Sequence, residues 1–181
     1  MLVCYTSGMR CQEDQHEAQA QHGIQLPQRA GPRPKTTPCA PHSQVDQIVP
    51  HARELAALLV SRLRTLSGVQ LGESRRAPPG TIGLYLEPAC CGGDETAFLL
   101  GREFAHVHVQ DDCSLHAILP EPLRETAIAE GWAEPHPLAG QPTVSPYTVM
   151  LYAPRDEQEV EVLRSLVLAS WTNARGQLPA G

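Results

Sequence analysis

The sequence has little aromatic character and no extended apolar run. Aromatic residues make up 4% of the 181 residues, whereas hydrophobic residues as a whole make up 41% and charged residues 19%. No apolar stretch approaches the roughly 18 residues that suggest a membrane span. The first residues also lack the basic start and long apolar core of a secretory signal. We therefore expect a globular protein that is neither secreted nor embedded in a membrane.

Basic charge and paired cysteines are also scarce. The formal net charge is −6, and the chain has no basic stripe with interleaved aromatic residues, the pattern that neutralises phosphate groups. The six cysteines show no CxxC or paired zinc-knuckle spacing. These absences argue against a nucleic-acid partner and favour a reducing, cytoplasmic setting.

Proline and glycine are abundant instead, with 17 and 14 residues. The stretch 11–43 is rich in Gln, Pro, His and Ala and has no periodic apolar pattern, so a disordered tail or linker is predicted over residues 1–46. A translation start placed too far upstream would give the same composition. The periodic apolar pattern that follows predicts one domain over residues 47–175, with a disordered C-terminus over 176–181.

The domain is expected to be α+β. Helical spacing and capping residues predict helices near 50–66, 122–130 and 156–172, the last capped by Asp156 with Glu159 three residues on. Alternation and turn residues predict strands at 81–86, 97–100, 104–109, 114–119 and 147–153, and an extended loop over 132–146. This order favours a mostly antiparallel sheet with helices packed on one face.

Two of these strands carry closely spaced histidines. In FAHVHV, alternation puts Phe104, His106 and His108 on one face and the small apolar residues on the other. If the strand forms a hairpin with SLHAIL, burying both apolar sets together pairs His108 with His116 and leaves 111–113 in the turn. His106, His108 and His116 are therefore predicted to share one face.

Such a face suits proton transfer or metal binding. Neighbouring imidazoles across a hairpin can act as general bases or hold a divalent metal ion. Satisfied structural histidines are the alternative interpretation. The thiol of Cys113 is a weaker candidate nucleophile, because a cysteine in an acidic turn usually has a raised pKa. Further candidates for the site are His136, Asp112 and Glu103.

Four other residues are candidates for substrate contacts. Arg155 follows a strand and precedes a helix, where its guanidinium could stabilise a carboxylate or enolate anion, although pairing with Glu157 or Glu159 is the more ordinary role for it. Arg102 beside Glu103 has the same ambiguity. Trp132 and Tyr152 could stack on a planar substrate, and core packing explains them equally well.

Three stretches together resemble the domain of the fungal luciferases that oxidise 3-hydroxyhispidin, and of bacterial proteins that share it. They are REFAHVHVQDDCSLHAILP, GWAEPHPLAG and LYAPRDEQEVEVLRSLVLAS, in that order, between about residues 101 and 171. The resemblance implies addition of molecular oxygen to a hydroxylated pyrone without a separate organic cofactor. Residues 44–101 match the family little, and no counterpart of its N-terminal membrane anchor is expected, so light emission is not expected either.

Three hypotheses follow. The first is an oxygenase-like enzyme that requires no cofactor: the histidines deprotonate a planar hydroxylated small molecule, Arg155 stabilises the anion, and molecular oxygen is the second substrate. The second is a metal-dependent hydrolase or non-haem iron enzyme with His106, His108 and His116 as ligands. The third is a non-catalytic module that binds a small ligand or a protein.

Overall fold

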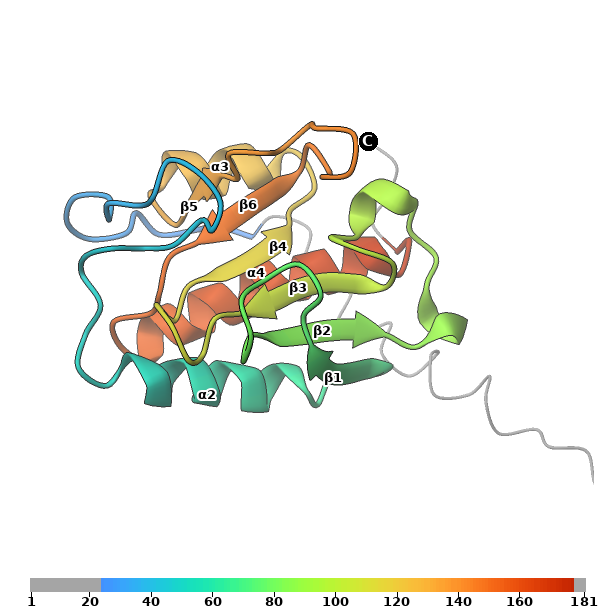
Figure 1. Ribbon diagram of the computed structural model, residues 1–181, viewed down its shortest axis with the longest axis horizontal. Helices are drawn as coiled ribbons and strands as arrows, with labels where there is room; N and C mark the ends of the chain where they lie inside the picture. Colours follow the sequence, from blue (N-terminus) through green and yellow to red (C-terminus); the bar gives the residue numbers. More distant parts are fainter. Residues whose placement is uncertain (1–23, 178–181) are drawn as a thin grey trace, which may run out of the picture.

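Six strands form one antiparallel sheet in the order β1-β2-β3-β4-β6-β5 (Figure 1). The computed structural model describes residues 24–177. The strands are β1 (Val69–Glu73), β2 (Ile82–Leu86), β3 (Glu103–Val107), β4 (Leu115–Ile118), β5 (Ala133–Pro135) and β6 (Thr148–Leu151). The helices are α2 (Ala52–Leu63), α3 (Leu123–Ala129) and α4 (Glu157–Ala174), with short 3₁₀ turns η1 (Pro88–Cys90) and η2 (Glu95–Ala97).

The two long helices cover one face of this sheet, which confirms the predicted α+β class. Helix α4 contacts α2, β3 and β4, and apolar side chains from all four elements belong to one buried core. Helix α4 begins where predicted, because the Asp156 carboxylate accepts a hydrogen bond from the Glu159 backbone N–H at 2.8 Å. It ends at Ala174, slightly beyond the predicted end.

The opposite face of the sheet carries the histidines. Ala105 and Val107 of β3 lie in the core, so alternation turns His106 to the other side, as predicted. The predicted register is wrong by two residues, however, because His116 pairs with His106 and not with His108. A two-residue slip leaves every side chain on its face, so the histidines still lie together.

Several short elements differ from the sequence prediction. Strand β1 was not predicted, and β5 lies inside the predicted 132–146 loop, where it pairs with β6 at the sheet edge. The strand predicted at 97–100 is wrong: this region holds η2 and a single bridge between Leu100 and Glu103. Helix α2 is shorter than predicted at both ends. Within the described residues, no helix is long and apolar enough to cross a membrane.

The segment 24–46 packs against the domain, which corrects the prediction that residues 1–46 form a tail. The Trp132 indole N–H donates to the Pro27 carbonyl at 2.6 Å, and the Arg29 side chain forms a buried ion pair with Glu159 at 2.9 Å. The segment is held by polar contacts with distant residues, so it shows no apolar periodicity of its own. Residues 1–23 of the predicted tail, and 178–181 of the predicted C-terminus, lie outside the described residues.

Candidate functional site

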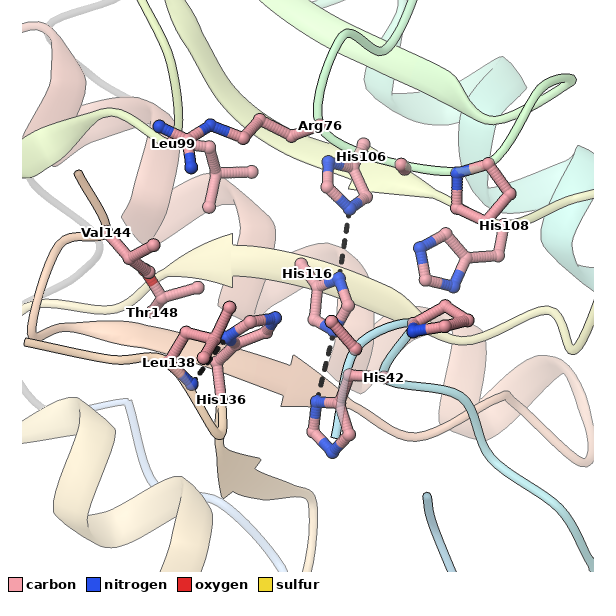
Figure 2. A pocket seen from close by; sticks show the side chains of 14 residues that line it. His42, Arg76, Leu99, His106, His108, His116, His136, Leu138, Val144 and Thr148 are labelled. Carbon is pink, nitrogen blue, oxygen red and sulfur yellow. Dashed lines mark hydrogen bonds between the residues drawn. The ribbon is translucent and has the colours of Figure 1, made fainter. Parts of the chain in front are cut away.

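A cavity of about 130 Å³ opens on the histidine face of the sheet (Figure 2). An engineered cavity of ~150 Å³ holds benzene, so this volume is about that of one six-membered ring. Polar imidazoles form its floor, and apolar side chains and a guanidinium form its walls. It is lined by Ala40, Pro41, His42, Arg76, Ala77, Pro78, Leu99, His106, His108, His116, His136, Leu138, Val144 and Thr148.

His106 is oriented by a buried carboxylate. Its Nδ1 lies 2.7 Å from Glu103 Oε1, and Glu103 also accepts hydrogen bonds from the Ser74 and Tyr85 hydroxyls at 2.6 and 2.9 Å. A register shift between β2 and β3 allows this arrangement, since Tyr85 pairs with Glu103 and Phe104 has no partner in the ladder. Simple alternation would have turned Glu103 away from His106.

His108 has a carboxylate partner of its own. Its Nδ1 lies 3.2 Å from Asp112 Oδ1 and 3.2 Å from Ser114 Oγ. The Ser114 hydroxyl donates to Asp112 at 2.8 Å, which leaves its oxygen to accept from the imidazole. The other nitrogen of His108, Nε2, is buried and has no hydrogen-bond partner among the described residues.

His116 is the centre of the cluster. Its Nδ1 faces His106 Nε2 at 3.0 Å, and its Nε2 faces His42 Nδ1 at 3.4 Å, as the dashed lines in Figure 2 show. Burial and the neighbouring histidines together hold the pKa of His116 well below its usual value. Burial likewise lowers the pKa of His106, although Glu103 opposes the effect.

His42 completes the row from the N-terminal segment, and sequence reasoning missed it. Its Nε2 lies 2.7 Å from Glu134 Oε1 on β5, and Glu134 also accepts from the Tyr152 hydroxyl at 2.9 Å. His42 falls in a proline-rich stretch that was assigned to the tail, and its burial depends on partners 74 and 92 residues away. No local pattern in the sequence indicates that contact.

His136 lies at the side of the cluster and is half-buried. Its Nδ1 accepts a hydrogen bond from the Leu138 backbone N–H at 3.1 Å, and its ring lies edge-on to His116 with centroids 4.9 Å apart. Burial, followed by repulsion from His42, His106 and Arg76, lowers the pKa of His136 to about 4. This histidine is therefore neutral at neutral pH.

The carboxylates of Glu103 and Asp112, which contact His106 and His108, are ionised. Burial disfavours the charged form of Glu103, but hydrogen bonds from His106, Ser74 and Tyr85 outweigh it and lower the pKa. Asp112 follows the same pattern, with His108 as its main partner. The cluster thus combines three imidazoles of lowered pKa, those of His106, His116 and His136, with anionic carboxylates.

The structure does not bring the predicted Arg155 to the cavity. Its guanidinium binds Glu159, with Nε 2.8 Å from Oε1, which is the glutamate pairing that was the alternative for this residue. The nearest candidate for the same role is Arg76, which lines the cavity and donates to the Thr143 carbonyl. Arg76 was missed because its loop, ESRRAPPG, has no pattern beyond a turn.

The other predicted contact residues also lie away from the cavity lining. Trp132 and Tyr152 are buried around Arg29, whose guanidinium lies 5.6 and 5.4 Å from their ring centroids. Arg102 donates to the Leu86 carbonyl at the far end of β2. Cys113 is buried, and burial followed by the charge of Asp112 raises the pKa of its thiol to about 11, which argues against a nucleophilic role.

Comparison with known proteins places this site in a family. Residues 101–170 match the family model described as "Luciferase domain". The luciferase of Neonothopanus nambi is 42% identical over 71 residues, which are 38% of this chain and 27% of the relative. The luciferases of Armillaria ostoyae and Armillaria gallica are 31% and 30% identical over 159 residues, covering 80% of this chain and 59% of each relative.

Residues 101–170 belong to the luciferase-domain family. The alignments with the Armillaria luciferases extend well beyond the motif region that carries the resemblance in the sequence. This luciferase-domain chain spans about three fifths of the length of those relatives. No solved structure gives a significant match. Four of the cavity histidines lie inside the residues matched by the family model, and His42 lies outside them.

Proposed function

We propose that this protein is a small-molecule enzyme of the oxygenase type, acting on a planar hydroxylated compound in the histidine cavity. One observation carries the proposal: five histidines from four separate segments line one ring-sized cavity. The names of the relatives support an oxidative reaction. The thiols of Cys39, Cys91 and Cys113, which form no disulfide among residues 24–177, suit work in a reducing compartment such as the cytoplasm.

The residues around the cavity suggest how such a substrate would be bound. Leu99, Leu138 and Val144 supply apolar contacts for a planar ring. The histidine face takes the proton of an acidic hydroxyl, because His108 lines the cavity and its Nε2 has no hydrogen-bond partner among the described residues. Arg76 then replaces Arg155 as the cation that stabilises the resulting anion, and His136 can donate a hydrogen bond from Nε2.

Oxygen uptake tests this proposal directly. Purified full-length protein is mixed with a panel of hydroxylated 2-pyrones, the substrate class that the family resemblance implies, in an oxygen electrode. We expect uptake that falls at least 100-fold in His108→Ala and about 10-fold or more in Arg76→Ala, while both variants keep their circular dichroism spectra. Arg53→Ala, an exposed arginine outside the cavity, is the matched control and should keep the wild-type rate.

Two other functions give different results in the same experiment. A metal-dependent hydrolase would consume no oxygen and would hydrolyse an ester or amide with a metal ion bound. A binding module would show saturable pyrone binding without turnover, and the binding would survive His116→Ala. Loss of the fold in His108→Ala would favour structural histidines.

A further inference from the structure

We infer that one ring nitrogen each of His106, His108 and His116 forms a binding site for a single divalent first-row transition-metal ion. The inference uses the cavity of the proposed function, but it does not depend on the reaction being an oxygenation. Nitrogen atoms of these three buried residues lie within 4.8 Å of one another. A second group, His42, His116 and His136, meets the same distance criterion, so the hydrogen-bond network must decide between them.

The partners of each ring fix where its proton lies. His106 Nδ1 contacts Glu103 at 2.7 Å, and the nearby Ser74 hydroxyl already donates its hydrogen to Glu103. His106 therefore carries its proton on Nδ1 and presents a lone pair at Nε2. His108 is assigned in the same way, because its Nδ1 donates towards Asp112 and Ser114. Its Nε2, which has no hydrogen-bond partner among residues 24–177, therefore presents the lone pair.

His116 is fixed through His42. Glu134 accepts from His42 Nε2 at 2.7 Å, and in the tautomer with its single proton on Nε2, His42 accepts at Nδ1. The nitrogen 3.4 Å from it, His116 Nε2, then carries the proton of that ring. His116 Nδ1 is left with a lone pair, and it faces the lone pair of His106 Nε2 at 3.0 Å.

In these tautomers the three rings turn lone pairs, and no N–H, towards one another. Two acceptors at 3.0 Å repel each other unless a proton or a metal ion lies between them. Imidazole nitrogens bind such ions at about 2.0–2.1 Å, which requires ligand nitrogens roughly 3.3 Å apart in a tetrahedral site. The three nitrogens lie within 4.8 Å of one another, so their longest separation has to shorten by at most about 1.5 Å to reach that spacing.

The surroundings of the triad match those of metal sites. Metal-binding histidines usually donate their other ring N–H to a carboxylate, as His106 does to Glu103 and His108 to Asp112. The second group lacks this property at His136, whose Nδ1 accepts from the Leu138 N–H. The proton of that ring must lie on Nε2, so His136 has no lone pair left to bind a metal.

Metal binding to the stripped, untagged full-length protein tests the inference. We would titrate Zn²⁺, Co²⁺ and, without oxygen, Fe²⁺ in equilibrium dialysis and measure bound metal by elemental analysis. We expect one ion per chain and at least 100-fold weaker binding in His106→Ala and His108→Ala. Glu103→Gln should weaken binding 10- to 100-fold. His136→Ala and the exposed His51→Ala should bind as the wild type does.

A wild-type readout keeps the inference testable if a histidine variant fails to fold. In protein labelled with ¹⁵N-histidine, Zn²⁺ should shift two Nε2 signals and one Nδ1 signal to metal-bound positions. Any other pattern overturns the assignment, as does equal loss of binding in His136→Ala. Failure of the folded wild type to bind any of the three ions below ~100 µM overturns the metal site.

The metal site and the proposed function can fail separately. Metal bound as described, with no oxygen uptake on the pyrone panel, contradicts the oxygenase proposal and leaves the metal site intact. Oxygen uptake at the wild-type rate by protein that binds none of the three ions supports the oxygenase proposal and overturns the metal site.

Discussion

The ion pair that anchors the N-terminal segment predicts an asymmetric response to mutation. The Glu159 carboxylate lies between two guanidinium groups, 2.9 Å from Arg29 Nη2 and 2.8 Å from Arg155 Nε. The side chains of Arg29 and Glu159 are 3% and 8% exposed, whereas that of Arg155 is 25% exposed. Only Arg155 can turn its charge to solvent if the carboxylate is lost.

The two substitutions should therefore differ in magnitude. Glu159→Ala leaves the Arg29 guanidinium buried without an anion, which costs about 3–5 kcal/mol. Arg29→Ala leaves Glu159 paired with Arg155 and removes a hydrogen bond to the Ala153 carbonyl and two cation–π contacts, a cost of about 1–3 kcal/mol. Both substitutions should also release residues 24–46.

Urea unfolding at pH 7.5, together with limited trypsin digestion after Lys35, measures both effects. Arg62→Ala is the control, because its ion pair with Glu161 is solvent-exposed and worth less than about 1 kcal/mol. Arg29→Ala that destabilises as much as Glu159→Ala would refute the reasoning. So would two variants that stay within about 1 kcal/mol of the wild type and resist trypsin.

Three further predictions concern pH, thiol reactivity and backbone packing. In the folded protein the pKa of His136 is about 4, and the pKa values of His106 and His116 are also lowered. Below about pH 6.5 the unfolded chain therefore binds more protons than the native state does. In EDTA, the free energy of unfolding should fall from pH 7 to pH 4.5, by on the order of 1–2 kcal/mol for His136 after solvent screening, and a flat profile would contradict this. Because the pKa of its thiol is about 11, Cys113 should react with iodoacetamide at pH 8 at least 10-fold more slowly than the exposed Cys39, as followed by peptide mass spectrometry. Equal labelling of the two cysteines would show that the Cys113 thiol is accessible. Gly92→Ala should destabilise the fold by about 2 kcal/mol or more in urea, because its Cβ would lie 2.3 Å from the Arg175 carbonyl oxygen; a change below ~0.5 kcal/mol would mean that the helix end can move.

Periodicity predicted the parts of the site that a single strand determines. Alternation alone places His106 and His108 on one face, and burial of the small apolar residues adds His116 to it. It could not decide the register, because two registers that differ by two residues bury the same side chains. The turn decides it: Asp112 accepts from the Ser114 N–H and hydroxyl, which brings His108 opposite Ser114.

The rest of the site depends on contacts between distant segments. Glu103 reaches His106 only because the ladder shifts at Phe104, and no alternation rule predicts a bulge. His42 and Arg29 lie in a segment without a core of its own, so composition predicted disorder there. Their partners Glu134 and Glu159 look like ordinary surface glutamates in the sequence, and each becomes informative only when its partner is known.

Asp112 shows that the fold and the histidine site are parts of one arrangement. Its carboxylate accepts from Ser114 to close the hairpin, from the Gln44 backbone N–H to hold the N-terminal segment, and from His108 to orient the imidazole. The turn, the segment that delivers His42 and the lone pair of His108 are therefore fixed together. A buried nitrogen without a hydrogen-bond partner destabilises the folded state by about 1–3 kcal/mol. A carboxylate that holds His108 in this orientation is therefore hard to explain by stability alone. It is readily explained if the nitrogen binds a cation or takes a proton from a ligand in the cavity.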